Sequence, residues 1–159
     1  LRCCYENSRD NARTPMQWTD DENAGFTDGM PWLAMNPNYR QINVREQEAR
    51  TDSVLVYYRR LVHLRKADAY RETFTYGIFE PAYQEMADVF AYYRVSGESG
   101  QRILVAANFG TDAVSLPLAY SCRQVLLSNL RAESAVETAC EKANALILES
   151  CEVAVIELG

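Results

Sequence analysis

A short stretch near the start of the chain concentrates polar side chains that could bind a ligand. Ser8-Arg-Asp-Asn-Ala-Arg-Thr-Pro-Met-Gln-Trp18 places two arginines, an aspartate and an asparagine close to a tryptophan. Arg9 and Arg13 each carry a planar fork of N–H donors that suits vicinal hydroxyls or a carboxylate, and Trp18 could stack on a sugar ring. The alternative is internal: Arg9 pairs with Asp10, and Trp18 anchors the loop in the core.

The remaining reactive side chains do not form a recognisable cluster. The five cysteines are an odd number without a CxxC pair, and the single histidine, His63, lies far from them in sequence. This spacing argues against a metal site or a disulfide framework, and reduced thiols are typical of a cytoplasmic protein. Cys122 and Cys151 lie in apolar, strand-like runs, so we expect both to be buried. The other three are Cys3, Cys4 and Cys140.

Composition excludes two classes of partner. The 159 residues carry a formal charge of −6, and the Lys and Arg residues are scattered, so we expect no nucleic-acid partner. No apolar run approaches the roughly 20 residues that span a bilayer, so we expect a soluble protein without membrane contact. The chain begins with Leu1 and has no signal-peptide pattern, so we expect a longer protein to continue upstream.

Three zones must position these side chains. Residues 8–51 are rich in Asn, Asp, Pro, Gly and aromatics without a helical or strand period, which predicts a long irregular loop ordered by its aromatic residues. Residues 54–66 repeat apolar side chains at helical spacing after Asp52 and Ser53, which predicts a capped helix. We expect His63 on this helix to be structural.

Beyond residue 71 the pattern changes to short β-like runs separated by turn residues. This pattern predicts a small antiparallel sandwich. The predicted strands are 74–79, 89–95, 102–109, 113–116, 124–127, 146–148 and 153–158. The pattern over 128–144 is ambiguous, because residues 131–140 could also form a helical turn.

Several motifs in the first 66 residues follow one another in the order of a known family. After the 8–18 stretch come Glu22-Asn-Ala-Gly-Phe-Thr27, Pro31-Trp32, Asn36-Pro-Asn-Tyr39, Ile42-Asn-Val44 and a helix ending in Leu64-Arg65-Lys66. This run resembles the oligo-1,6-glucosidase and α-glucosidase group of glycoside hydrolase family 13, in the α-amylase superfamily. The β region resembles that family's C-terminal domain in pattern only.

The resemblance implies an α+β chain in two parts. Residues 1–70 would be the last active-site loop and last helix of a (β/α)8 barrel, and 71–159 a C-terminal antiparallel β-sandwich domain. A barrel needs about 250 residues, so only its end would lie here. The family's retaining mechanism implies a nucleophile and an acid/base that we expect upstream of Leu1, so the chain alone is expected to be inactive. No metal or cofactor is expected in this chain, although calcium is possible in the missing N-terminal part.

The resemblance also assigns roles within the 8–18 stretch. Arg13 matches the family arginine that reaches the non-reducing-end glucose, so it is the expected substrate-binding residue. Arg9 and Asp10 match the same motif and are expected to support and orient it. Other aromatic residues of the loop are expected to be loop core rather than sugar platforms: Trp18, Phe26 and Trp32.

The activity implied for the parent protein is exo-acting hydrolysis of α-glucosidic bonds in short oligosaccharides such as isomaltose. Trehalose-6-phosphate hydrolases and sucrose isomerases share the loop motif and remain alternatives. A non-catalytic alternative is a homologue of the heavy chains of amino-acid transporters. A free-standing sugar-binding β module is a further alternative, against which the loop counts, because its aromatic residues would then be exposed.

Overall fold

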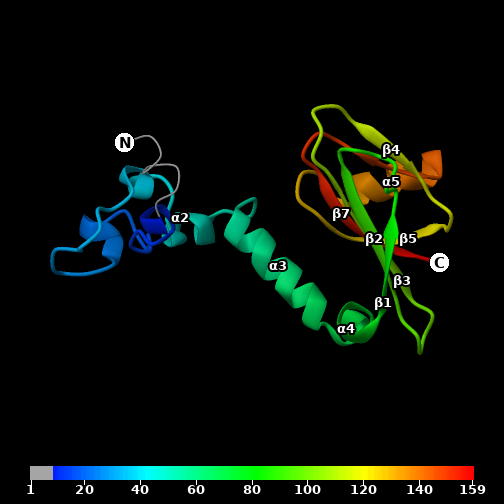
Figure 1. Cartoon of the computed structure of the whole chain (residues 1–159), viewed down its shortest axis with the longest axis horizontal. Helices are drawn as coiled ribbons and strands as arrows, with labels where there is room; N and C mark the ends of the chain where they lie inside the picture. The colour runs from blue at the N-terminus through cyan, green and yellow to red at the C-terminus, as the bar shows by residue number, and fades with distance from the viewer. Residues whose placement is uncertain (1–8) are drawn as a thin grey trace. The chain divides into compact units, whose positions relative to one another are not determined.

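The structure is a computed structural model that describes residues 9–159, apart from the side chains of Arg9 and Asn11 (Figure 1). Contacts divide the chain into two compact units, residues 1–59 and 60–159, here called the loop unit and the β unit. The boundary falls inside one helix, α3 (Val54–Lys66). The predicted division at residue 70 concerns the domains of a parent enzyme and stays a prediction.

The loop unit is built from short helical turns joined by extended segments. Its elements are η1 (Arg9–Ala12), η2 (Glu22–Gly25), η3 (Pro37–Arg40) and the α-helix α2 (Val44–Ala49). The prediction of a wholly irregular loop missed α2, because six residues are too few to show a helical period. Its signal was Asn43, whose side chain accepts a hydrogen bond from the Glu46 N–H at 2.9 Å and donates to the Tyr39 carbonyl at 2.9 Å.

Helix α3 forms as predicted, with Ser53 at its start. The Ser53 hydroxyl accepts from the Val56 N–H at 3.2 Å and donates to the Gln47 carbonyl at 2.6 Å. No residue of α3 is buried, and Val54 and Tyr58 are exposed apolar side chains. His63 lies on the exposed surface of this helix. Within residues 9–159, no helix is long and apolar enough to cross a membrane.

The predicted strand at 74–79 is wrong, because its first residues belong to α4 (Asp68–Tyr76). Arg94 donates to the carbonyls of Thr73 and Phe74 at 3.4 and 3.2 Å, which places a cation at the C-terminal end of this helix. Phe74 meets Tyr70 edge-on one turn earlier, at 6.4 Å between ring centroids. The chain then turns at Gly77, where a Cβ would lie 2.4 Å from the Thr73 carbonyl oxygen.

The β unit contains two antiparallel sheets, as predicted (Figure 1). The larger sheet has the order β1-β2-β3-β7-β5, and β4 pairs with β6 in a two-stranded ribbon. Its strands are β1 (Ile78–Ala82), β2 (Val89–Val95), β3 (Arg102–Asn108), β4 (Val114–Pro117), β5 (Cys122–Ser128), β6 (Ala145–Leu148) and β7 (Val153–Leu158). The ambiguous segment forms a helix, α5 (Glu133–Ala143), which ends at Asn144 in the left-handed conformation.

The core of the β unit lies between the large sheet and a layer made of the β4–β6 ribbon and α5. Leu104 and Ile156 face it from the centre of the sheet, directly opposite each other in the β3–β7 pairing. Leu116, Leu146 and Val136 close it from the other layer, and all three are fully buried. A sheet with one covered face packed on a second layer is the sandwich that the strand pattern predicted.

A buried ion pair joins the connections at one end of this sandwich. Glu152 is fully buried before β7, and its carboxylate accepts from Arg131 Nε at 3.0 Å and Arg131 Nη2 at 2.8 Å. The same carboxylate accepts from the Ser128 hydroxyl at 3.0 Å and from the Glu149 N–H at 2.9 Å. Hydrogen bonding to Glu152 raises the pKa of Arg131. The buried charge is thus fully paired.

The cysteine predictions are correct only in part. Cys122 is half-buried, and Cys140 on α5 is buried. Cys151 is exposed, contrary to expectation, because it lies in the turn before β7 with a φ of 58° rather than in the strand. Cys3 and Cys4 lie outside the described residues.

Candidate sugar-binding loop

Arg13 follows directly after η1 and presents its guanidinium at the surface of the loop unit. A turn places it, since the Arg13 N–H donates to the Asp10 carbonyl at 3.0 Å. Arg13 Nη1 lies 3.8 Å from Asp10 Oδ1, and its Cζ lies 5.6 Å from the centroid of the Trp32 ring. About half of the Arg13 side chain is exposed (50%). The predicted substrate-binding residue is therefore accessible and held from two sides.

The sequence-predicted supporting residues differ in what the structure describes. Asp10 lies beside Arg13, as an orienting role requires, although that role stays a prediction. Arg9 begins η1, and its side chain lies outside the described part. The contact that sequence reasoning missed is the one between Arg13 and Trp32. The sequence signal for this contact was that the Pro31-Trp32 motif follows the 8–18 stretch in the same order as in the family.

A hydrogen-bonded framework holds the loop that carries Arg13, without a large apolar core. Gln17 is its centre: its side-chain Nε2 donates to Asn38 Oδ1 at 3.0 Å and to the Ile42 carbonyl at 2.5 Å. The Gln17 carbonyl accepts from the Val44 N–H at 2.9 Å. These bonds tie the end of the 8–18 stretch to η3 and to the first turn of α2. The polar composition of the loop thus has a structural use.

A tight reversal at Asn23, Ala24 and Gly25 supports the segment that carries Trp32. All three residues have φ values between 51° and 64°, and the Ala24 carbonyl accepts from the N–H groups of Trp18 and Thr19. The left-handed region favours Asn and Gly, whereas Ala24 is strained there and is fully buried. Asn23 Nδ2 donates to carbonyls farther along the loop, at Thr27 and Gly29.

Acidic side chains of the loop are engaged in exposed ion pairs. Arg45 reaches Asp20 Oδ1 and Asp21 Oδ2, each at 3.0 Å. Hydrogen bonding with Thr19 and then the Arg45 guanidinium hold the pKa of the Asp21 carboxyl below its ordinary value. These carboxylates fasten α2 to the loop, and neither carries a sequence mark of catalysis.

The loop aromatics are exposed in this chain, whereas the prediction that they are loop core concerns a parent enzyme with a barrel packed on the loop and stays a prediction. Trp18 and Phe26 are each 48% exposed, and Trp32 is 80% exposed. The loop unit folds around hydrogen bonds and small side chains, so its own residues leave about half of Trp18 and Phe26 and most of Trp32 uncovered. Exposed aromatic rings are available to a neighbouring domain or to a sugar.

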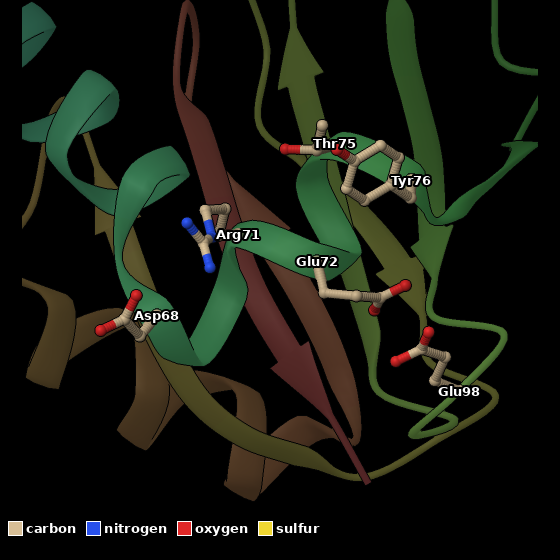
Figure 2. Close-up of a pocket in the computed structure, with 6 residues that line it drawn as sticks. All are labelled: Asp68, Arg71, Glu72, Thr75, Tyr76 and Glu98. Carbon is tan, nitrogen blue, oxygen red and sulfur yellow. The ribbon is translucent and has the colours of Figure 1, made fainter.

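A cleft lies in the β unit, between α4 and the β2–β3 hairpin (Figure 2). It is a cleft of about 470 Å³ lined by Asp68, Arg71, Glu72, Thr75, Tyr76 and Glu98. In Figure 2 the Glu72 and Glu98 side chains extend toward each other, while Arg71 lies on the Asp68 side. Five of its six lining residues are exposed, so water screens their charges. None of the predicted site residues lines this cleft.

Comparisons with known proteins show which family the chain resembles. The family described as alpha amylase, catalytic domain, matches residues 2–77. An oligo-1,6-glucosidase of Bacillus cereus is 39% identical over 138 residues, which cover 84% of this chain and 24% of that enzyme. A glucan 1,6-alpha-glucosidase of Streptococcus pneumoniae is 41% identical over 129 residues, covering 81% of this chain and 23% of the relative.

A solved structure agrees with the sequence matches. The isomaltulose synthase of Klebsiella sp. LX3 superposes with a TM-score of 0.80 and 34% identity, over 96% of this chain and 26% of that enzyme. The chain spans about a quarter of the length of these relatives. Its sequence motifs, its β-sandwich and these matches agree, and the chain belongs to the α-amylase family, glycoside hydrolase family 13.

Proposed function

We propose that the chain is the C-terminal part of a retaining, exo-acting α-glucosidase of the oligo-1,6-glucosidase type. The observation that carries this proposal is the 8–18 motif with Arg13 accessible and held by Asp10 and Trp32. Relatives named for 1,6-glucosidase activity match this chain at about 40% identity and support the proposal. The parent enzyme would work in the cytoplasm on short oligosaccharides.

The proposed chemistry divides between this chain and the preceding barrel. Retaining hydrolysis uses two carboxyl groups about 5 to 5.5 Å apart, one as nucleophile and one as acid/base. Both would come from barrel strands upstream of Leu1. Arg13 would donate hydrogen bonds to a hydroxyl of the non-reducing-end glucose, a contact that positions the sugar for attack. Asp10 and Arg9 would orient that guanidinium.

An isomerase of sucrose is the second candidate, and the likeness to the isomaltulose synthase supports it. Isomerisation begins with the same glycosidic cleavage, so Arg13 would contact the glucosyl unit in either reaction. The two candidates differ in the acceptor: water in the hydrolase, and fructose in the isomerase. That choice depends on residues outside this chain, as does the choice of trehalose 6-phosphate as substrate.

The test is to extend the reading frame upstream of Leu1, express the whole protein and measure products from isomaltose, maltose, trehalose 6-phosphate and sucrose. Glucose from isomaltose is expected. Arg13→Ala should lower kcat/KM about 10- to 100-fold, as expected for loss of a charge-assisted hydrogen bond. Arg50→Ala is the matched control, because Arg50 forms an exposed pair with Asp52. A frame that begins at Leu1, or a barrel without its two carboxylates, would overturn the proposal.

A further inference from the structure

The guanidinium of Arg13 is bracketed by two side chains of different character. Asp10 comes from the turn just before it, whereas Trp32 comes from a separate segment of the loop unit. The Arg13 Cζ lies 5.6 Å from the Trp32 ring centroid, within the range of a cation–π contact. An arginine with free rotamers loses entropy when it binds a ligand, and these contacts restrict it in advance.

Trp32 holds this place without being buried. Its ring is 80% exposed, so core packing does not account for its position. The segment before it is fastened instead by Asn23, whose side-chain amide donates to the Thr27 carbonyl at 3.2 Å and to the Gly29 carbonyl at 3.1 Å. A fixed backbone with an exposed ring over an arginine is an arrangement that orients the arginine.

We propose that Trp32 is a positioning residue for Arg13, an inference that rests on the proposed function. The Trp32 ring centroid lies 5.6 Å from Arg13 Cζ, and the Asp10 carboxylate attracts Nη1. Together these two contacts limit the directions that the remaining N–H donors can take when a sugar hydroxyl binds. A lysine at position 13 would keep the charge but lose the planar fork that stacks on the ring.

The expected size of the effect follows from the contact. Removal of an exposed cation–π pair should lower kcat/KM about 3-fold. Removal of a pair that the rest of the enzyme and the sugar desolvate should lower kcat/KM up to about 30-fold. Trp32→Leu removes the π face and should show this fall. Trp32→Phe keeps an aromatic face and should restore most of the activity. Met30→Ala, on the same loop and 97% exposed, is the control that should leave kcat/KM unchanged.

The decisive kinetic experiment is a double-mutant cycle in the whole enzyme, with Trp32→Leu, Arg13→Ala and both together. If Trp32 acts through Arg13, Trp32→Leu has no further effect once Arg13 is alanine. Multiplicative losses in the double variant would overturn the positioning role while leaving Arg13 as a binding residue. An Arg13→Ala variant with full activity would instead refute the proposed role of Arg13 itself.

A second readout needs no activity. In the 159-residue chain, the ring current of Trp32 should shift the Arg13 Nε–Hε proton upfield in NMR spectra. Trp32→Leu should move this resonance back toward its random-coil position, and Met30→Ala should leave it in place. An Arg13 resonance that Trp32→Leu does not move would show that the contact is absent, and would overturn the inference whatever the kinetics.

Discussion

Glu152 offers a direct test of what holds the β unit together. Its buried carboxylate accepts from Arg131, Ser128 and the Glu149 N–H, and 25% of the Arg131 side chain is exposed. Glu152→Gln keeps the shape but turns one acceptor into a donor. With the amide oxygen in the place of Oε2, near Arg131 Nη2 and the Glu149 N–H, the NH2 group faces Arg131 Nε. The 3.0 Å hydrogen bond from Nε is then lost, and the other bonds from Arg131 go to a neutral oxygen.

The magnitude follows from that loss. A hydrogen bond to a charged group is worth about 1.5–3 kcal/mol, so Glu152→Gln should lower the free energy of unfolding by about 2–3 kcal/mol. Glu152→Ala leaves Arg131 without its partner and should cost about 3–5 kcal/mol. The matched control is Glu80→Gln, because the Glu80–Arg102 pair has a 46% exposed carboxylate and should contribute below about 1 kcal/mol.

Urea unfolding can resolve the two units, because both tryptophans, Trp18 and Trp32, lie in the loop unit. Tryptophan fluorescence follows the loop unit alone, whereas far-UV circular dichroism follows both units, so a dichroism transition without a counterpart in fluorescence belongs to the β unit. Glu152→Gln should lower the dichroism midpoint at an unchanged slope and leave the fluorescence transition in place. A loss no larger than that of Glu80→Gln would refute the buried, fully paired carboxylate.

Further predictions concern the helix cap and the thiols. Ser53→Ala removes the acceptor of the Val56 N–H and should cost about 1 kcal/mol of helix stability, seen as lost helical dichroism, whereas Ser53→Thr keeps a hydroxyl that both accepts and donates and should retain that stability. Burial raises the pKa of Cys140 to about 12, so iodoacetamide at pH 8 should modify Cys151 and leave Cys140 unmodified until urea is added, as peptide masses would show. The folded-state pKa of Cys140 lies above its ordinary value of 9.0, so its contribution to stability is complete below about pH 9 and is lost as the pH rises toward 12. The urea midpoint should fall with pH over that window, and less so in Cys140→Ala.

Elements with a clear local period could be predicted from the sequence. The helix at 54–66 and the strands at 89–95 and 153–158 have the predicted bounds, because each carries enough alternating or helical apolar positions to identify itself. The aromatic alternation around Phe74 misled, since Arg94 from another element caps the α4 carbonyls and favours the helix there. Such a contact has no local signature.

The candidate site divides in the same way. Motif order alone led to Arg13 and to the α-amylase family, because the residue types and spacings of a binding loop are written along one segment. Which ring faces Arg13, and whether Trp32 is covered, depend on residues far apart in sequence that only folding brings together. Local patterns therefore determined the family, most strands and the choice of Arg13 as the candidate binding residue, whereas the tertiary structure decided helix α4, the buried Arg131–Glu152 pair and the ring that lies against Arg13.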